Sequence, residues 1–247
     1  MEVCVDSVQS AINAQAGGAS RVELCANLME GGTTPSIGLL KVIKSQITIP
    51  VFVMIRSRGG DFCYNDLEME VMKEDLLALK RAGADGFVFG VLTQDGEVNA
   101  AACQSLLDIA RPCPVTFHRA IDMARDIYFS LTTVINLGFD RILSSGGYNS
   151  ALEGCNVLQA MVQQTQGVKT IVVPGGGIKI DNLEQILLKS QAKEFHGSAR
   201  RVIDSVMTFR KCNLTMGSQP DIEFITKVTS TEDVSKMVSI YNSIYVN

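Results

Sequence analysis

The sequence predicts a single α/β domain in which eight strand–helix units close into a (β/α)8 TIM barrel. Three observations support this prediction. Strand-like apolar segments alternate with helical segments, which is typical of parallel βαβ units. A turn built on glycine recurs between a helix and the following strand. The chain has 247 residues, 46% of them hydrophobic, and this length fits one barrel of this kind.

The recurring turn lies at residues 16–24, 81–89 and 136–144, which read A-G-G-A-S-R-V-E-L, R-A-G-A-D-G-F-V-F and N-L-G-F-D-R-I-L-S. In each copy a helix is expected to end at glycine, which accepts the left-handed conformation of a helix C-cap. Residues 190–198, S-Q-A-K-E-F-H-G-S, form a fourth copy without the glycine. The recurrence favours a closed barrel over an open doubly wound sheet, which is the alternative architecture.

Four further strands are expected between these turns, at residues 2–5, 51–56, 115–119 and 170–173. The middle two follow Pro50 and Pro114, and proline suits the first residue of a strand because it lacks a ladder donor.

The clearest helix spans residues 65–82, where Asn65 can cap the start and Gly83 can end it. One face of this helix is apolar and carries Met69, Met72, Leu76 and Leu79.

The region after the eighth strand departs from the repeat. Residues 199–229 show no clear helix, and the last helix is expected only at residues 232–244. A connection of about 30 residues is unusual in a compact domain unless it has a role. We therefore expect a long irregular arm, residues 199–229, that packs on the barrel or on a neighbouring subunit, within one domain of residues 1–247.

Composition excludes several classes of protein. The net charge is −4, without the clustered basic face that nucleic-acid binding requires. No apolar run approaches 18 residues, so no membrane span is expected, and the N-terminus lacks the features of a signal peptide. Seven cysteines at irregular spacing, with no C-x-x-C pair, indicate reduced thiols in a cytoplasmic protein.

Ionisable residues alternate with apolar ones on several of the expected strands. Because side chains two apart share a face of a strand, one face carries Glu2, Cys4 and Asp6, then Glu23 and Cys25, Thr116 and His118, and Glu194, His196 and Ser198. The apolar set should meet the helices, so this set should point into the barrel. A ligand-filled barrel mouth would explain it, since burying such groups unpaired is costly. The alternative is an internal ion-pair network that plugs the barrel.

Three loops at the carboxyl ends of strands carry further candidates. The segment 114–123, P-V-T-F-H-R-A-I-D-M, turns from apolar to charged at His118, Arg119 and Asp122. The segment 56–62, R-S-R-G-G-D-F, offers Arg56 and Arg58 for an anion, although a tight turn with solvated arginines is the alternative.

A third loop is glycine-rich. Gly175, Gly176 and Gly177 follow the seventh strand and Ser198 follows the eighth. These two positions form the usual phosphate site of such barrels. The alternative is a flexible turn.

The motifs of the chain resemble one family, the CutC copper homeostasis family, and within it the animal members most. They are M-E-V-C-V-D-S, R-V-E-L-C, E-G-G-T-T-P-S, R-x-R-G-G-D-F, D-G-F-V-F-G, T-F-H-R-A-x-D-M, P-G-G-G-I and E-F-H-x-S-A-R, in order from Met1 to about Arg210. The resemblance implies a TIM barrel, self-association, a cytoplasmic location that extends to the nucleus in animals, and copper handling with Cu(I) binding. It also implies that Cys4 and Cys25 are the strand-end cysteines of the family.

Two positions depart from the family pattern. Ser57 stands where proline is usual, and Gly197 stands where cysteine or serine is expected. The second change removes a sulfur beside His196 that could have been an additional ligand.

Two hypotheses follow for function. In the first, the chain binds Cu(I) for intracellular copper balance through Cys4 and Cys25, because soft thiolates select Cu(I); the alternative for these cysteines is an ordinary place in the core. In the second, the chain is an enzyme acting on a small anionic or phosphorylated metabolite. Its acid and base candidates are Glu2, Glu23, His118 and His196, and Arg56, Arg119 and the glycine loop would hold charge.

Overall fold

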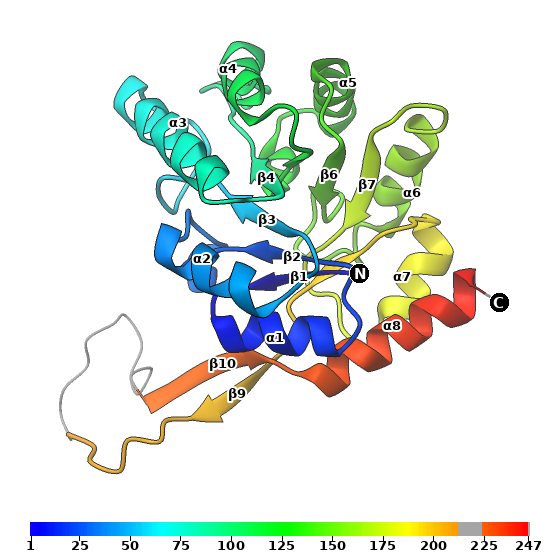
Figure 1. The fold of residues 1–247 in the computed structure, drawn as a ribbon. Helices are drawn as coiled ribbons and strands as arrows, with labels where there is room; N and C mark the ends of the chain where they lie inside the picture. Colours follow the sequence, from blue (N-terminus) through cyan, green and yellow to red (C-terminus); the bar gives the residue numbers. More distant parts are fainter. Residues whose placement is uncertain (212–223, 247) are drawn as a thin grey trace.

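The chain folds into a nearly closed barrel of eight parallel strands surrounded by helices (Figure 1). A computed structural model describes residues 1–211 and 224–246. The ladder runs in the order β7-β6-β5-β4-β3-β2-β1-β8, as a chain of strand–helix units predicts. The TIM-barrel prediction is confirmed.

The barrel strands are β1 Glu2–Val5, β2 Arg21–Leu24, β3 Val51–Met54, β4 Gly86–Phe89, β5 Val115–Phe117, β6 Arg141–Ser144, β7 Ile171–Pro174 and β8 His196–Gly197. The helices are α1 Val8–Ala16, α2 Ile37–Gln46, α3 Asp66–Arg81, α4 Ala100–Ala110, α5 Ile127–Leu137, α6 Cys155–Gln164, α7 Leu183–Ser190 and α8 Thr231–Tyr245. Two short 3-10 helices, Leu28–Glu30 and Arg119–Met123, follow β2 and β5.

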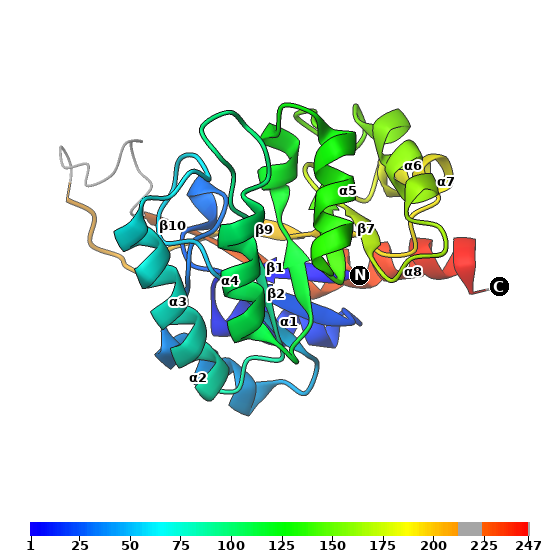
Figure 2. The same ribbon diagram turned by 90° about the horizontal axis from the view of Figure 1, so that it is seen from above.

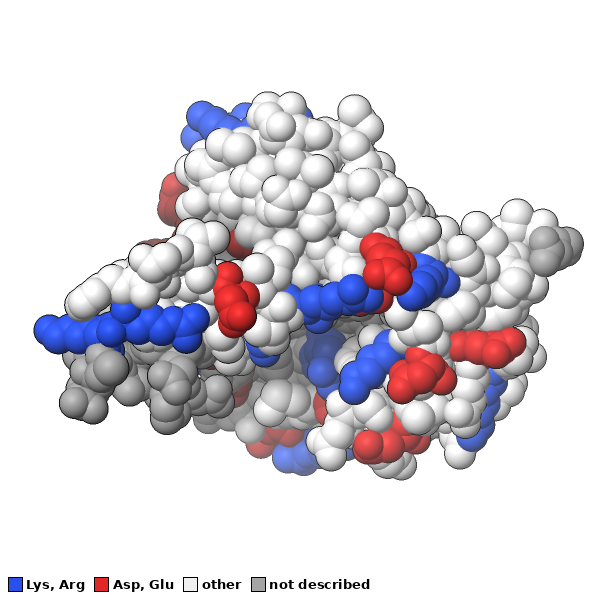
Figure 3. Space-filling model, turned by 90° about the horizontal axis from the view of Figure 1, so that it is seen from below, with Lys and Arg blue, Asp and Glu red and all other residues white. Residues whose placement is uncertain are grey.

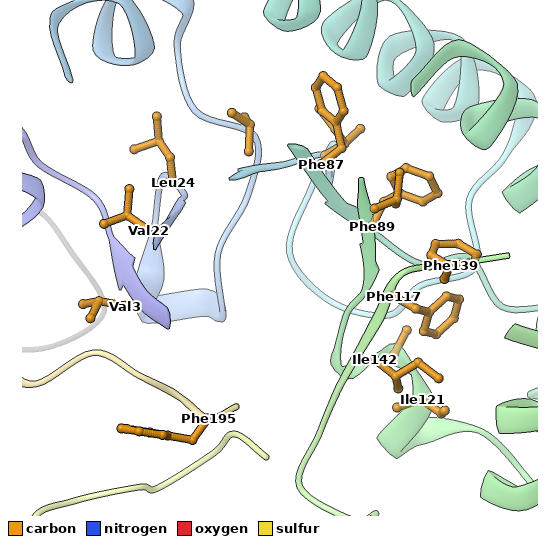
Figure 4. Close-up of a cluster of buried hydrophobic side chains, with 14 of the residues drawn as sticks. Val3, Val22, Leu24, Phe87, Phe89, Phe117, Ile121, Phe139, Ile142 and Phe195 are labelled. Carbon is orange, nitrogen blue, oxygen red and sulfur yellow. The ribbon is translucent and has the colours of Figure 1, made fainter. Parts of the chain in front are cut away.

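The apolar set of each strand packs outward against the helices, as the alternation predicts. Val3, Val22 and Leu24 belong to this main core (Figure 4). Phe139 packs edge-on against Phe117 at a centroid distance of 5.3 Å. Burial of such side chains contributes about 1.5–3 kcal/mol each to stability. The opposite face of these strands is thereby left to the polar set.

The register of β1 places the polar residues of three strands side by side. Glu2 is paired with Arg21 on β2 and with His196 on β8, and Cys4 is paired with Glu23. Paired residues on adjacent parallel strands lie about 4.8 Å apart. One contiguous patch of ionisable groups therefore forms inside the barrel around β1.

The seam between β7 and β8 has no ladder within the described residues. The chain after β7 approaches β8 closely at Gly175 instead. A Cβ built on Gly175 would lie 2.5 Å from Leu143 and 3.3 Å from the Cβ of His196. A larger residue would have to displace the Leu143 side chain, so this loop glycine has a packing role as well as its expected place at the rim.

Helix ends match the expected signals closely. Asn65 caps α3 and forms a capping box with Glu68, and Gly83 follows its end with φ +96°. In the fourth copy of the turn, which lacks glycine, Gln191 takes the left-handed conformation with φ 60°. The turn geometry is therefore retained where its usual residue is missing.

The expectation of an irregular arm at residues 199–229 is wrong for residues 200–204 and 225–229, whereas residues 205–211 form neither strand nor helix. Strands β9 (Arg200–Asp204) and β10 (Ile225–Thr229) form an antiparallel hairpin that extends away from the barrel (Figures 1 and 2). β-Branched residues in both segments favour extended pairing. The hairpin is fixed to α1, where Asn13 donates to the carbonyl of Thr229 at 2.8 Å and Ser10 accepts from its amide.

Charges of both signs are interspersed among the described residues on the face shown in Figure 3, without a continuous basic patch. Among the described residues, no helix is long and apolar enough to cross a membrane.

Candidate functional site

A cavity of about 780 Å³ opens at the carboxyl edge of the barrel, where this fold places its ligands. Side chains from strands around the barrel line it, and the polar ones among them include Cys4, Glu23, Arg56, His118, Arg119 and His196. Gly176 and Gly177 of the glycine loop and Ser198 also border it. The structure thus brings most of the sequence-predicted candidates to one place.

An ion-pair network fills the barrel near Glu2. Arg21 pairs with Glu2 and, through Nη2 at 2.6 Å, with Glu194, which also accepts from Arg141 Nε at 2.9 Å. Both arginines stack on the ring of Phe52, at 5.5 and 5.6 Å from its centroid. The sequence allowed either an internal ion-pair network or a cavity. The structure contains both, the network near Glu2 and the cavity at the barrel mouth. The sequence analysis did not identify Arg21 as part of this set, although it lies two residues before Glu23 and therefore shares its face of the strand.

Glu2 links this plug to the cavity wall. Its carboxylate contacts Arg21 and also His196 Nδ1 at 2.8 Å, and its side chain is 1% exposed. Burial alone would raise the pKa of Glu2, but Arg21 and His196 outweigh burial and lower it to about 2. Glu2 is therefore a carboxylate at neutral pH that holds His196 in place, and this charge makes it a poor general acid.

Cys4, Glu23 and His196 bring one thiol, one carboxyl and one imidazole together. Their potential ligand atoms all lie within 4.8 Å of one another. His196 Nε2 faces the Glu23 carboxylate at 3.7 Å. Burial lowers the pKa of His196, but the neighbouring Cys4, Glu23 and Glu2 more than offset burial and leave it well above its usual value. Among the described residues, this is the group with metal-ligand spacing.

Cys25 lies beside this group and not in it. The thiol is fully buried and donates to Glu23 Oε2 at 3.5 Å. It packs with Phe52, Met54 and Val88, and a Cβ on Gly32 would lie 3.1 Å from its sulfur. Burial, Glu23 and Cys4 raise the pKa of Cys25 well above its usual value. The thiol is therefore protonated at neutral pH in this arrangement.

Gly197, the departure from the family pattern, lies on the other face of β8 from His196, because neighbouring residues alternate on a strand. A Cβ at this position would lie 3.6 Å from Met237 and 3.8 Å from Met1. A cysteine or serine here would point toward these methionines, so its absence leaves the group of Cys4, Glu23 and His196 intact.

His118 directly follows β5, caps the 3-10 helix Arg119–Met123, and is 3% exposed. Its Nδ1 accepts from the amide of Ala120 at 3.3 Å, so in the neutral ring the hydrogen is on Nε2. Nε2 has no hydrogen-bond partner in the structure. Burial and the charge of Arg56 lower the pKa of His118 to about 3. The ring is therefore a neutral hydrogen-bond donor at physiological pH, and it cannot act as a general acid through an imidazolium.

The two histidines are accordingly expected to titrate differently. Imidazole ¹⁵N shifts of His118 should stay constant between pH 5 and pH 8, because its lowered pKa keeps the ring neutral throughout. His196, whose pKa is raised, should stay protonated over the lower part of that range. Long-range ¹H–¹⁵N spectra measure both, and a His118 midpoint near 6.5 would contradict the buried, uncharged assignment.

Arg56 differs from its predicted role as a free anion-binding group. Its Nη1 donates to the carbonyls of Glu30 and Gly32 at 2.9 and 2.8 Å, and its Nη2 donates to that of Gly60 at 2.7 Å. The guanidinium therefore fastens the loops after β2 and β3 to each other. Its Nε is buried and has no partner in the structure.

The Asp122 carboxylate accepts hydrogen bonds from several residues around it. It accepts from Arg119 Nε at 2.8 Å, from Ser144 Oγ at 2.6 Å, and from the amides of Ser145 and Gly147 at 3.0 Å. A carboxylate that accepts this many hydrogen bonds fixes the loop after β6 in place.

The anion candidates separate into two groups. Arg119 and Gly176 adjoin, since a Cβ on Gly176 would lie 3.2 Å from Arg119 Nη1. Arg58, in contrast, pairs with Glu68 and Asp61 and does not line the cavity. These contacts leave Gly176 and Gly177 with Arg119, and not Arg58, as the candidate anion site at the rim.

The fold and this site define a class: a TIM-barrel protein with a thiol, a carboxyl and an imidazole at the mouth of the barrel. The chain belongs to the CutC family, whose sequence model matches residues 1–201. It is 52% identical to the human copper homeostasis protein cutC homolog over 247 residues, which is all of this chain and 90% of that protein. The expected resemblance to animal members is thereby confirmed.

Solved structures agree on the fold. The copper homeostasis protein CutC from Streptococcus agalactiae superimposes with a TM-score of 0.75 at 35% identity, covering 80% of this chain and 97% of that one. Thiamine phosphate pyrophosphorylase from Pyrococcus furiosus has a TM-score of 0.61 at 16% identity, with 99% and 96% covered. The second likeness concerns the fold alone.

Proposed function

We propose that this protein serves intracellular copper homeostasis and binds Cu(I) at the mouth of the barrel. The observation that carries the proposal is the group of Cys4, Glu23 and His196, whose ligand atoms lie within 4.8 Å of one another. Thiolate and imidazole are ligands that suit copper, and thiolate selects Cu(I) over harder cations. The names of the human and Streptococcus agalactiae relatives support the same role.

Cys4 is the principal ligand in this proposal and Cys25 is the second sulfur. Cys4 lines the cavity, whereas Cys25 reaches the group through its hydrogen bond to Glu23. His196 adds a nitrogen whose other ring atom is held by Glu2, the kind of outer partner that orients a metal-binding histidine. Because the pKa of Cys25 is raised, binding at its sulfur must release a proton, and affinity should rise with pH.

Copper K-edge absorption spectroscopy on the protein loaded with one equivalent of Cu(I) under reducing conditions tests this site. The expected spectrum shows at least one sulfur scatterer, and competition with a Cu(I) chelator should give tighter binding at pH 8 than at pH 6. A spectrum with only nitrogen and oxygen scatterers, or affinity that does not change with pH, contradicts thiolate ligation.

Self-association and a cytoplasmic location, extending to the nucleus, stay part of this proposal as predictions. The β9–β10 hairpin supports the first of them. It extends from the barrel (Figure 1) and exposes one apolar side chain on each of its faces, Val202 at 58% and Ile203 at 48%. Exposed strands of this kind favour pairing with another chain.

A further inference from the structure

The cavity has a second wall, away from Cys4, whose hydrogen-bonding groups are unused. His118 and Arg56 are 3% and 4% exposed, and both line the cavity. The Nε2 of His118 and the Nε of Arg56 are buried and without partners in the structure. Buried donors are nearly always paired in folded proteins, so these two atoms indicate a missing acceptor.

Phe62 brings the two donors to one wall. The centroid of its ring lies 4.7 Å from the centroid of the His118 ring. The same centroid lies 4.9 Å from Cζ of Arg56. Arg56 Nη1 and Nη2 donate to backbone carbonyls, and the guanidinium also interacts with the Tyr64 hydroxyl. Within the described part of the chain no carboxylate pairs with Arg56. A buried positive charge without an anion is costly, so this wall favours an electron-rich or anionic ligand atom.

The rim offers a different kind of group. Gly176 and Gly177 have φ of +99° and +69°, and within the described residues their amides and that of Ser198 donate no hydrogen bond. Arg119 borders them and is held by Asp122 and Ser145 through Nε and Nη2, at 2.8 Å each, which leaves Nη1 beside Gly176. Free amides next to a guanidinium form an anion-binding concavity, and in this fold it lies where phosphate binds.

We propose that the cavity binds a small sugar phosphate or similar phosphorylated hydroxy or carbonyl compound in two parts. The phosphate occupies the rim between Arg119, Gly176, Gly177 and Ser198. An oxygen at the other end of the molecule accepts from His118 Nε2 and Arg56 Nε. The volume of 780 Å³ lies within the range of small-molecule sites, about 300–1,000 Å³. The inference deepens the metabolite hypothesis and does not depend on copper binding.

Amide and imidazole NMR shifts of the copper-free protein test the two parts separately, with inorganic phosphate and ribose 5-phosphate as probes. Phosphate should shift the amides of Gly176, Gly177 and Ser198 and leave His118 Nε2 unchanged. Ribose 5-phosphate should shift both regions and bind at least about tenfold more tightly, because it adds charge-assisted and neutral hydrogen bonds at the wall.

The matched variant is His118→Asn, whose side-chain oxygen can still accept from the Ala120 amide while the Nε2 donor is lost. It should bind phosphate as the parent does and lose the tenfold advantage of ribose 5-phosphate. Arg58→Gln, outside the cavity, should change neither affinity. Equal binding of the two probes by the parent, or rim amides that do not move at millimolar concentrations of either probe, overturns the proposal.

Discussion

Replacing Cys4 by serine should weaken Cu(I) binding by more than about a hundredfold. Loss of a residue that only supports a metal ligand typically costs about 10–100-fold in affinity, and Cys4 is proposed as a direct ligand. Cys4 is the thiol of the group whose ligand atoms lie within 4.8 Å, and a hydroxyl is a much poorer ligand for a soft ion. Glu23 and His196 would remain, but neither supplies sulfur. Competition against a Cu(I) chelator under reducing conditions measures the change.

Two other cysteines provide a graded comparison. Cys25→Ser should also weaken binding, since its thiol contacts Glu23 at 3.5 Å. Cys103→Ser should leave affinity unchanged, because that thiol is buried in α4 and contacts the carbonyl of Val91 at 3.8 Å. Cys212→Ser should likewise leave the affinity for Cu(I) unchanged; Cys212 lies outside the described residues. Parent-like affinity in both Cys4→Ser and Cys25→Ser would place the copper site elsewhere.

Alternation along the strands was enough to predict which residues point into the barrel. Glu2, Glu23, His118 and His196 were expected near one cavity, and the structure places the last three on its lining, with Glu2 bound to His196. This works because the period of a strand is fixed and the apolar set must meet the helices. The same rule applied to Arg21 would have revealed the ion-pair plug.

Other features depend on contacts between distant segments and leave no local signal. The donors of Arg56 are taken by carbonyls up to 26 residues away. Besides Arg119, the groups that donate to Asp122 belong to Ser144, Ser145 and Gly147, at the end of β6 and in the loop after it, 22 to 25 residues on. Sequence spacing identifies these residues as ionisable but cannot show that their hydrogen bonds are already used. The β9–β10 hairpin was missed for a related reason: its two strands are separated by a long connection without a short turn signal.

Glu2→Gln should lower the free energy of unfolding by roughly 3–5 kcal/mol at pH 7, the usual cost of removing one partner from a buried ion pair. The change keeps the size of the side chain and removes the negative charge between Arg21 and His196. The pKa of Glu2, lowered from 4.5 to about 2, gives a similar figure of roughly 3 kcal/mol by proton linkage. Burial opposes this shift, and Arg21 and His196 produce it.

The stabilisation that Glu2 provides should decrease at low pH. Because the folded pKa is below the unfolded one, the stabilisation by Glu2 is complete above pH 4.5 and is lost as the pH falls toward 2. Urea denaturation of both proteins at pH 7, 5 and 3 should therefore show a constant difference between pH 7 and 5 and a smaller one at pH 3. Glu232→Gln, which removes an exposed partner of Lys236 and Arg201, should keep a denaturation midpoint near the parent's. A Glu2→Gln midpoint equally close to the parent's would show that the plug does not stabilise the barrel.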